Sequence, residues 1–219
     1  FHLAGLEYHG QFNLLKGGIV SSDWIATVSP TYAREIQRHS YGFGLDGVIR
    51  SRRDQLTGIL NGIDTGVVIP ADDPLIAYPY DASSLDQKQK NKEELIAELG
   101  LEIDRQTPLI GMVTRLTRQK GIDLVIRVLD EILHAGAGFV LVGTGDRDYE
   151  NFFRGIGHRS GNRARGFTRF DDRLAHRIYA GSDFFLMPSM FEPCGLAQMI
   201  ALRYGSLPIV RSTGGLQDT

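Results

Sequence analysis

The sequence has a single cysteine and no long apolar run. Cys194 is the only cysteine among 219 residues, which excludes a disulfide within the chain and fits a reducing compartment. No segment approaches the ~18 consecutive apolar residues that a membrane-spanning helix needs. We therefore expect a chain that does not span a membrane.

A strong net charge of either sign is also missing. The 24 lysines and arginines nearly balance the 26 aspartates and glutamates, which leaves a formal charge of −2. So small a charge does not hold a whole chain on nucleic acid or anionic lipid, and we expect neither as a partner. The content of 42% hydrophobic and 23% charged residues is that of a globular protein and excludes a disordered chain.

Several well-known motifs are absent or incomplete. We find no zinc-ligand spacing, P-loop or nucleophile elbow. The turn Gly143–Asp146 lacks the third glycine of a dinucleotide fingerprint, because that position is Asp148, and this weakens a nicotinamide-dependent oxidoreductase. Asp146 and Asp148 either hold a metal that bridges a diphosphate or favour a helix start. We prefer the helix start and expect no metal or other cofactor.

From residue 108 onward, strand-like segments alternate with helix-like ones. Short apolar runs predict strands at 108–113, 138–142, 183–187 and 207–210, and a weaker pattern indicates one more around 163–167. Helical spacing predicts helices at 120–134, 171–180 and 196–204, and the polar segment up to residue 158 is compatible with another. This order predicts an α/β fold, a doubly wound parallel sheet with helices on both faces and ligands at the carboxyl ends of the strands.

The first 60 residues resemble the closing elements of another α/β unit. We predict a helix at 6–20, a strand at 24–28, and a helix from Pro30 to Gln37 capped by Ser29. A turn-rich connection with three prolines spans 70–84. We place the boundary near Asn61, with one incomplete domain at 1–60 and a second at 61–219. Because the chain begins in mid-pattern and ends after a Gly-Gly turn, we expect it to be a piece of a longer protein.

A basic loop follows the first predicted strand of the second domain. It runs from Thr114 to Gly121 and places Arg115 and Lys120 between a strand and a helix, where a doubly wound sheet holds phosphate. Arginine forms two-pronged contacts with phosphate, and lysine adds a point charge. The alternative is a solvated basic loop, which spacing alone favours.

Two further loops follow predicted strands. Phe191–Leu196 brings a carboxylate, Glu192, beside backbone donors, which suits a polyhydroxylated and phosphorylated ligand. Alternatively, Glu192 is an acid in the first turn of a helix and Pro193 its first-turn proline. Thr213–Leu216 is a tight turn whose amides either meet phosphate or only reverse the chain. No histidine-containing motif lies near Cys194, so we interpret it as a packing residue.

Taken together, these stretches resemble the glycogen and starch synthases that use ADP-glucose. The resemblance covers nearly the whole chain, and many independent motifs occur in the family's order. The matching segments are 10–16, 27–34, 44–47, 58–64, 115–121, 176–181, 191–196 and 202–218.

The resemblance implies a fold and a reaction. The family is a retaining glycosyltransferase family of the GT-B type, with two facing doubly wound, Rossmann-like domains. It transfers glucose from ADP-glucose to the non-reducing end of an α-1,4-glucan, and basic side chains hold the diphosphate without a metal. The implied location is the cytoplasm of a bacterium or the stroma of a plastid, where the family serves glycogen or starch biosynthesis.

The resemblance also implies roles for individual residues. Arg115 and Lys120 would bind the diphosphate and stabilise the departing ADP, and Glu192 would hold glucose hydroxyls. Phe170 falls where the family has an aromatic residue, usually tyrosine, that stacks on adenine. The backbone of Cys194, Gly195 and Leu196 would line the sugar pocket, Thr213, Gly214 and Gly215 would help to hold the phosphates, and Asn61 would lie at the hinge near the acceptor.

The sequence departs from the family at several points. The family's lysine-glycine-glycine motif and its catalytic histidine belong to an early segment with no counterpart here, and Lys16–Gly18 is a different motif. Val68 replaces a usual tryptophan and Ala197 a common threonine. We therefore expect a synthase fragment that does not transfer glucose by itself.

Other functions are compatible with parts of this pattern. A glycosyltransferase of the sucrose-phosphate synthase type usually has a second glutamate eight positions after the first, but that position is Ile200 here. A non-catalytic domain that binds nucleotide or glucan is the other alternative.

Overall fold

The computed structural model of the chain describes residues 5–219. Its internal contacts divide the chain into two compact units. The smaller unit comprises the residues up to Gly62 together with Phe191–Gly195 and Ser212–Thr219, and the larger comprises Ile63–Met190 and Leu196–Arg211. Each unit is described by itself below. The domain boundary near Asn61 stays a prediction.

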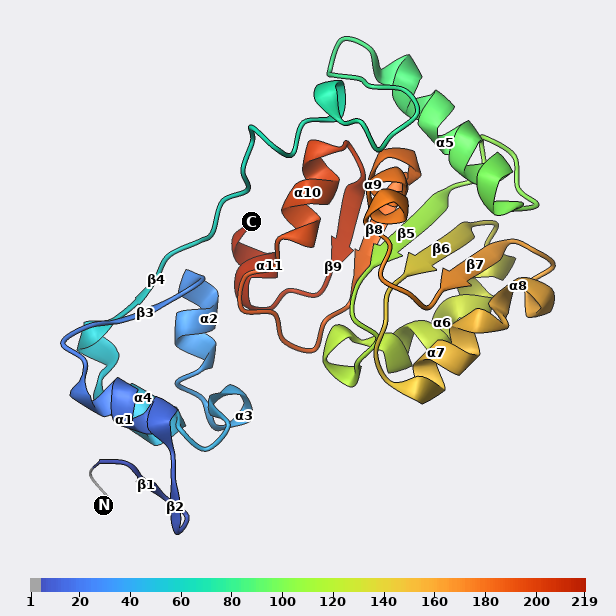
Figure 1. Cartoon of the computed structure of the whole chain (residues 1–219). Coiled ribbons are helices and arrows are strands. Elements are labelled where there is room, and N and C mark those ends of the chain that lie inside the picture. The colour runs from blue at the N-terminus through green and yellow to red at the C-terminus, as the bar shows by residue number, and fades with distance from the viewer. Residues whose placement is uncertain (1–4) are drawn as a thin grey trace. The chain divides into compact units, whose positions relative to one another are not determined.

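The larger unit is built on a five-stranded parallel sheet (Figure 1). The strand order runs outward in both directions from β5, so that the direction of winding reverses between β5 and β8. This is the doubly wound arrangement, and it confirms the predicted α/β fold class. In spatial order the strands are β7 (Ala164–Phe167), β6 (Gly138–Val142), β5 (Leu109–Val113), β8 (Phe184–Met187) and β9 (Leu207–Val210).

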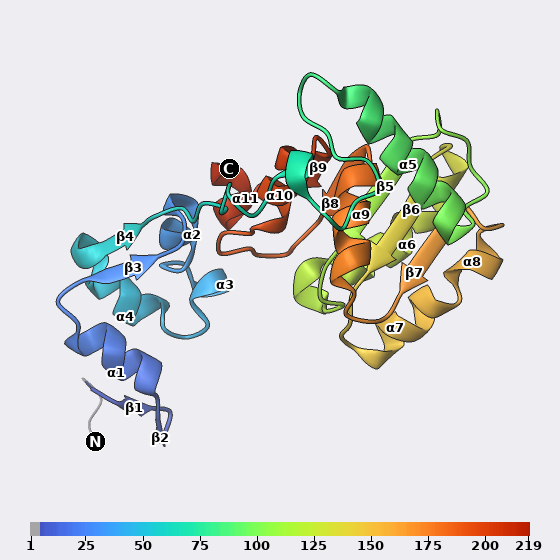
Figure 2. The same ribbon diagram turned by 45° about the horizontal axis from the view of Figure 1, so that its top comes forward.

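Helices cover both faces of this sheet, as predicted (Figures 1 and 2). Along β5, Ile110 and Met112 point into the core beneath α6, whereas Gly111 faces the other way. A side chain at Gly111 would collide with Ile178 and Ser182 at the end of α9, so a glycine there lets that helix pack closely. One face carries α6 (Ile122–His134), α7 (Arg147–Arg154) and α8 (Ile156–Arg159), and the other carries α9 (Asp172–Gly181) and, packed on α9, α5 (Leu85–Leu99).

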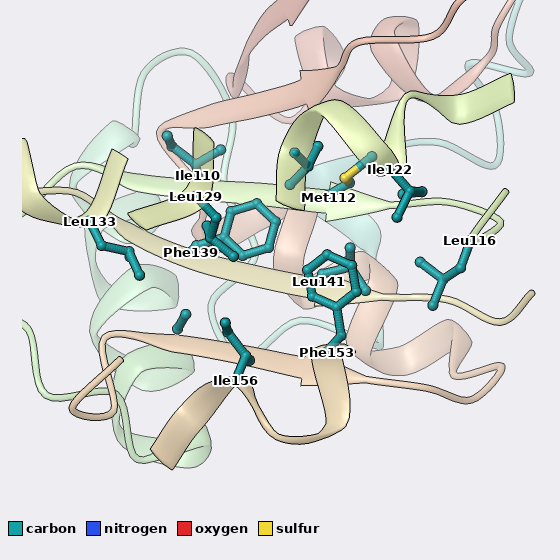
Figure 3. Packing of buried hydrophobic residues seen from close by; sticks show 12 residues of the cluster. Ile110, Met112, Leu116, Ile122, Leu129, Leu133, Phe139, Leu141, Phe153 and Ile156 are labelled. Atoms are coloured by element: carbon teal, nitrogen blue, oxygen red, sulfur yellow. The ribbon is translucent and has the colours of Figure 1, made fainter. Parts of the chain in front are cut away.

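The core of the larger unit lies between the sheet and the helices α6, α7 and α8 (Figure 3). Its largest members are fully buried aromatic side chains, Phe139 of β6 and Phe153 of α7, whose rings stack with centroids 6.2 Å apart. Aliphatic residues at helical spacing along α6, such as Val125 and Leu129, belong to the same buried cluster as the side chains of the sheet. This core fixes the ends of β5 and β6, from which the candidate site is built.

The remaining elements of the larger unit differ in detail from the prediction. The helix predicted from residue 120 begins at Ile122, because Arg118–Lys120 form a 3-10 turn and Gly121 takes a left-handed conformation with φ 71°. α10 (Ala197–Arg203) precedes β9. The sequence analysis did not predict α5, which follows the turn-rich connection and its 3-10 turn Pro70–Asp72.

The smaller unit begins with a hairpin where a helix was predicted. β1 (Glu7–Tyr8) pairs antiparallel with β2 (Gln11–Phe12), and α1 starts only at Leu14 and runs to Ser21. The prediction of a helix over 6–20 is therefore wrong for its first half. The reason is the two-residue turn His9–Gly10, in which both residues have positive φ, at 52° and 81°.

The other elements of the smaller unit agree better with the sequence. Ser29 caps α2 as predicted, since its hydroxyl oxygen accepts the amide hydrogen of Tyr32 at 2.9 Å. Thr213 directly precedes a short helix, α11, rather than a bare turn. The elements are β3 (Ile25–Thr27), α2 (Pro30–Glu35), α3 (His39–Gly42), α4 (Asp46–Ser51), a 3-10 turn at Arg53–Gln55, β4 (Leu56–Gly58), parallel to β3, and α11 (Gly214–Asp218).

Within residues 5–219, none of the helices combines the length and the apolar character needed to cross a membrane.

Candidate functional site

A cavity of about 340 Å³ lies in the larger unit at the carboxyl ends of β5 and β6. This is the edge at which doubly wound sheets bind their ligands, as the sequence predicts. Its rim comes from the loops after three strands, residues 113–115, 142–144 and 169–172. Its inner wall comes from α9, α10 and the connection before α5, through Val68, Ala175, His176, Tyr179, Ile200 and Tyr204.

A larger hollow of about 710 Å³ lies at the opposite ends of β5 and β8. Its charges are matched internally: Lys92 and Asp183 form an ion pair at 2.6 Å, and Arg105 lies 3.4 Å from Glu93. We assign no ligand to it.

The loops that follow β5 and β6 are joined to each other at the rim of the cavity. The amide of Leu116 donates to the carbonyl of Thr144 at 2.8 Å, and the amide of Asp146 donates back to the carbonyl of Leu116 at 2.8 Å. Gly143 and Gly145 permit this approach, because a side chain on either would collide with the backbone of the neighbouring loop. The glycines of this turn therefore serve loop-to-loop packing, and Thr144 is left facing the cavity.

Asp146 occupies the residue position before α7, but its side chain makes no capping hydrogen bond. The carboxylate of Glu150 instead turns back and accepts the amide hydrogen of Gly145 at 3.0 Å. Asp146 therefore stands at the start of a helix, as predicted, but its side chain does not cap that helix. Among residues 5–219 no cluster of three potential metal ligands occurs.

Of the two predicted basic residues, Arg115 lines the cavity and Lys120 does not. Arg115 lies two residues after the end of β5 and is exposed to solvent, and no ion pair of its guanidinium occurs within the described residues. An arginine without an internal acid at a cavity rim is available to a ligand anion. Lys120 ends the 3-10 turn that precedes α6.

Phe170 stands on the same rim as Arg115, and its side chain is 89% exposed. Its neighbours are fixed. Arg169 lies over the ring of Phe167 at 5.1 Å and pairs with Asp171 at 2.7 Å, while Asp171 caps α9 by accepting the amide hydrogen of Leu174 at 2.9 Å. The backbone hydrogen bond from Leu174 and the charge of Arg169 lower the pKa of Asp171 below its ordinary value, although burial opposes this. An exposed aromatic ring on a fixed loop provides a stacking surface.

The inner wall contains a hydrogen-bonded group that the sequence analysis missed. Asp73, which is 4% exposed, accepts hydrogen bonds from the Tyr204 hydroxyl at 2.6 Å and from the amide of Leu75 at 2.8 Å. Oδ2, the carboxylate oxygen that accepts the hydrogen bond from Tyr204, also lies 2.8 Å from Nδ1 of His176. The Tyr80 hydroxyl donates to the carbonyl of Tyr204 at 2.8 Å. His176 and Tyr204 line the cavity, so Asp73 holds two of its wall residues in place.

These contacts shift the pKa values of Asp73 and Tyr204. Burial alone would raise the pKa of Asp73, but hydrogen bonds from Tyr204, His176 and Leu75 hold it below its ordinary value. Burial, together with the charge and hydrogen bond of Asp73, raises the pKa of the Tyr204 hydroxyl. Asp73 is therefore ionised and accepts hydrogen bonds at neutral pH.

Two positions at which the sequence departs from the patterns discussed above also line the cavity. Val68 and Ile200 both belong to its wall. The connection that carries Val68 is held against α10, since Arg203 donates to the carbonyl of Val68 at 3.3 Å.

In the smaller unit, the predicted phosphate loop is bonded to a carboxylate. The hydroxyl of Thr213 and the amide of Gly214 donate to Oε1 of Glu35 at 2.9 and 3.0 Å, and the amide of Gly215 donates to the carbonyl of Glu192 at 3.0 Å. Two of the amides expected to meet phosphate thus have partners within the chain. Their role with a ligand stays a prediction.

The loop 191–195 lies in the smaller unit as well. Glu192 and Cys194 are buried, at 6% and 4% exposure, and Gly195 has φ 77°. Because α10 begins only at Ala197, the alternative that places Glu192 and Pro193 in the first turn of a helix is wrong. The burial of Cys194 agrees with its interpretation as a packing residue.

The structure therefore brings some of the predicted site residues together and not others. Arg115 and Phe170 share one cavity, while Leu196, also in the larger unit, is half exposed and lies just before α10. Glu192, Cys194, Gly195, Thr213, Gly214, Gly215 and the exposed Asn61 belong to the smaller unit. Their union into one site stays a prediction.

Two family models match the chain. The model described as "Starch synthase catalytic domain" matches residues 1–51, and the model described as "Glycosyl transferases group 1" matches residues 107–219, more than half of the chain.

The similar curated proteins are bacterial glycogen synthases. The chain is 51% identical over 219 residues to that of Bacillus cereus (strain Q1) and 48% identical to that of Thermodesulfovibrio yellowstonii. These alignments cover 100% of the chain but only 46% and 44% of the two relatives. The chain thus spans somewhat less than half the length of the relatives it matches.

The structure is also similar to solved structures. The catalytic domain of starch synthase IV from Arabidopsis thaliana, bound to ADP and acarbose, matches with a TM-score of 0.91 and 42% identity, covering 98% of this chain and 44% of that one. A sucrose-phosphate synthase from Thermosynechococcus elongatus matches with a TM-score of 0.62 and 20% identity, over 97% of this chain and 47% of that one, which shows a shared fold alone.

Proposed function

The chain belongs to the glycosyl transferases group 1 and, within it, to the glycogen and starch synthases, and from this premise we propose that its cavity binds the nucleotide of ADP-glucose. The protein that carries it then transfers glucose from ADP-glucose to the non-reducing end of an α-1,4-glucan with retention of configuration. The proposed location is the cytoplasm in a bacterium or the plastid stroma in a plant.

One observation carries this proposal. A guanidinium and an exposed aromatic ring, those of Arg115 and Phe170, line one cavity at the carboxyl edge of a doubly wound sheet. A nucleoside diphosphate needs both features, a cation for its phosphates and a flat apolar surface for its base. Support comes from the similar starch synthase structure, which is bound to ADP and acarbose.

The proposed division of work follows from the chemistry of each residue. Arg115 binds the diphosphate and stabilises the negative charge that grows on it as the bond to glucose breaks. Lys120 adds a second cation from the following turn. Glu192 holds glucose hydroxyls, and the loop of Thr213, Gly214 and Gly215 supports the phosphates. We propose that these basic residues do the work without a metal ion.

Calorimetric titration of the 219-residue chain with ADP and, separately, UDP tests the proposal. We expect saturable ADP binding that is tighter than UDP binding, unchanged by EDTA, and weakened about tenfold or more in Arg115→Ala, which loses a charge-assisted contact. Arg118→Ala is the matched control, because Arg118 lies on the neighbouring turn and does not line the cavity. Absence of ADP binding by a folded chain would contradict the proposal.

Transfer itself is tested separately. The lysine-glycine-glycine motif of the family has no counterpart here, since Lys16–Gly18 lies inside α1. We therefore propose that the chain by itself does not elongate glucans. Incorporation of labelled glucose from ADP-glucose into glycogen by the purified chain would disprove this part.

A further inference from the structure

His176 lines the cavity, and one of its two ring nitrogens is anchored by a buried carboxylate. Nδ1 lies 2.8 Å from Oδ2 of the buried Asp73. Nε2 is on the opposite side of the ring, 3.8 Å from Oδ1 of Asp172, a residue of the cavity rim whose side chain is 68% exposed. At 3.8 Å this second contact is too long for a hydrogen bond.

The anchor determines which nitrogen of the neutral ring carries the proton. An ionised carboxylate only accepts hydrogen bonds, so Nδ1 is the donor toward Asp73 and Nε2 is left as an acceptor. The Tyr204 hydroxyl lies 3.3 Å from the same Nδ1, but it donates its only hydrogen to Oδ2 of Asp73 at 2.6 Å and has none left for Nδ1. In the neutral ring, Nε2 is thus a fixed acceptor for whatever occupies the cavity.

The rest of the cavity suits the base of a nucleotide. Phe170 offers its ring at the rim, and Ile200, Tyr179 and Ala175 make the inner wall largely apolar. A base placed there needs a hydrogen-bond donor opposite Nε2. Adenine has such a donor in its exocyclic amino group, whereas hypoxanthine has a carbonyl acceptor at the same position.

We infer that His176 selects the base of the nucleotide by accepting a hydrogen bond from its exocyclic amino group, and that Asp73 is the positioning residue that sets this tautomer. The inference rests on the nucleotide site proposed above. Asp73 comes from the connection before α5 and does not line the cavity, so it contributes to specificity without touching the ligand. A purely structural Asp73 would affect all nucleotides alike.

The test compares ADP with inosine diphosphate, which differs in having a carbonyl in place of the amino group. Both are titrated into the 219-residue chain and its variants. We expect the unmodified chain to bind ADP about tenfold more tightly, because the carbonyl sets two acceptors against each other and loses one hydrogen bond.

Asp73→Asn gives the sharpest outcome. Oδ1 of residue 73 already accepts the amide hydrogen of Leu75 at 2.8 Å, so the new amide nitrogen takes the place of Oδ2. There it donates one hydrogen to Nδ1 of His176 and the other to the hydroxyl oxygen of Tyr204. The proton then moves to Nε2, which becomes a donor. We expect the preference for ADP to be lost or reversed while nucleotide binding persists. A preference unchanged in Asp73→Asn would overturn the inference.

A second variant covers the case in which Asp73→Asn does not fold. His176→Asn keeps an amide near the position of Nδ1 and removes Nε2, so the ratio of the two affinities is expected to approach one. Asp130→Asn is the control for the loss of a negative charge, because Asp130 is exposed on α6 and does not line the cavity, and its ratio is expected to stay that of the unmodified chain. If Asp130→Asn lowers the ratio as Asp73→Asn does, loss of charge rather than tautomer is responsible and the inference fails.

Nitrogen-15 spectra of the imidazole rings report the tautomer directly. A proton on Nδ1 of His176 is expected, and one on Nε2 of the neutral ring would overturn the assignment.

The titrations with the two nucleotides also separate this inference from the proposed nucleotide site. If neither nucleotide binds to the folded chain, the proposed nucleotide site is wrong and this inference falls with it. If both bind with equal affinity, only the selection by His176 is wrong.

Discussion

The carboxylate of Asp218 accepts two hydrogen bonds from Thr31 in the first turn of α2, one from the amide at 2.7 Å and one from the hydroxyl at 2.6 Å. Glu35, at the other end of the same helix, accepts hydrogen bonds from Thr213 and Gly214 at the start of α11. The two short helices α2 and α11 therefore cap each other reciprocally. This pair of contacts joins segments separated by about 180 residues of sequence.

This reciprocal capping predicts a shared stability contribution. Asp218→Ala removes two hydrogen bonds from the first turn of α2, where Ser29 remains the N-cap, and we expect a loss of about 1–2 kcal/mol in the free energy of unfolding. Urea unfolding followed by circular dichroism measures it. Asp54→Ala is the control, because Asp54 is 83% exposed and pairs only with Arg53 at 3.7 Å. Equal stability of the two variants would show that the caps contribute nothing.

The sequence predicts the larger unit well because its signals are local. Except for β7, whose sequence includes an arginine and a glycine, each strand from β5 to β9 is a short apolar run that ends at a turn, and the alternation of strand and helix determines the fold class. The turn His9–Gly10 shows where a prediction from spacing fails, since the apolar spacing of residues 6–20 is compatible with a helix while the turn requires positive φ at two residues. The polar α5, with little apolar periodicity, gave no signal.

The site was predictable only where its residues follow strands. Arg115 lies two residues after the end of β5, so its position at the carboxyl edge follows from the fold class. Asp73 and His176 were missed because their hydrogen bond joins positions 103 residues apart. His176 opens the segment 176–181 that resembles the family, but the resemblance gave it no role. A lone aspartate in a turn-rich connection looks like any turn residue. Its burial, visible only in the structure, is what identifies it.

Phe170 tests whether the rim of the cavity supplies a stacking surface. Phe170→Ala is expected to weaken ADP binding about tenfold, since stacking of one base on an aromatic ring contributes about 1–3 kcal/mol. Phe170→Tyr is expected to bind within about twofold of the original chain, because a tyrosine ring stacks equally well. Phe12→Ala, which removes a 69% exposed ring in the smaller unit, is the control. Calorimetry decides, and full affinity in Phe170→Ala would exclude stacking.

Gly145 tests the junction of the two loops at the rim. A methyl group at this position would collide with the carbonyl of Leu116, to which the amide of Asp146 donates. We expect Gly145→Ala to lower the free energy of unfolding by about 1–3 kcal/mol, the usual cost of overpacking. Gly155→Ala is the control, because a methyl group there meets no atom within 4 Å. Denaturant unfolding of both variants measures the difference, and similar midpoints would contradict the packing argument.

Lys88 provides a prediction for alkaline pH. Its ammonium group donates to the carbonyls of Ala180 and Ser182 at 2.8 and 3.0 Å and lies 3.2 Å from the hydroxyl of Ser206, at the end of α9. Burial lowers the pKa of Lys88 from 10.5 to about 8, against the opposing charge of Asp183. Between these two values the unfolded chain binds the proton more often than the folded chain. The free energy of unfolding therefore rises with pH through this window.

Lys88→Met isolates the effect, because every other titrating group is common to both proteins. The free energy of unfolding of the original chain minus that of Lys88→Met is expected to increase from pH 8 to pH 10.5 and to level off outside that range. Lys90→Met is the matched control, since Lys90 lies on the exposed side of the same helix with its ammonium 4.0 Å from Asp86. A difference that stays flat with pH would show that Lys88 keeps its ordinary proton affinity. Its hydrogen bonds to the end of α9 would then offset the cost of burying the charge.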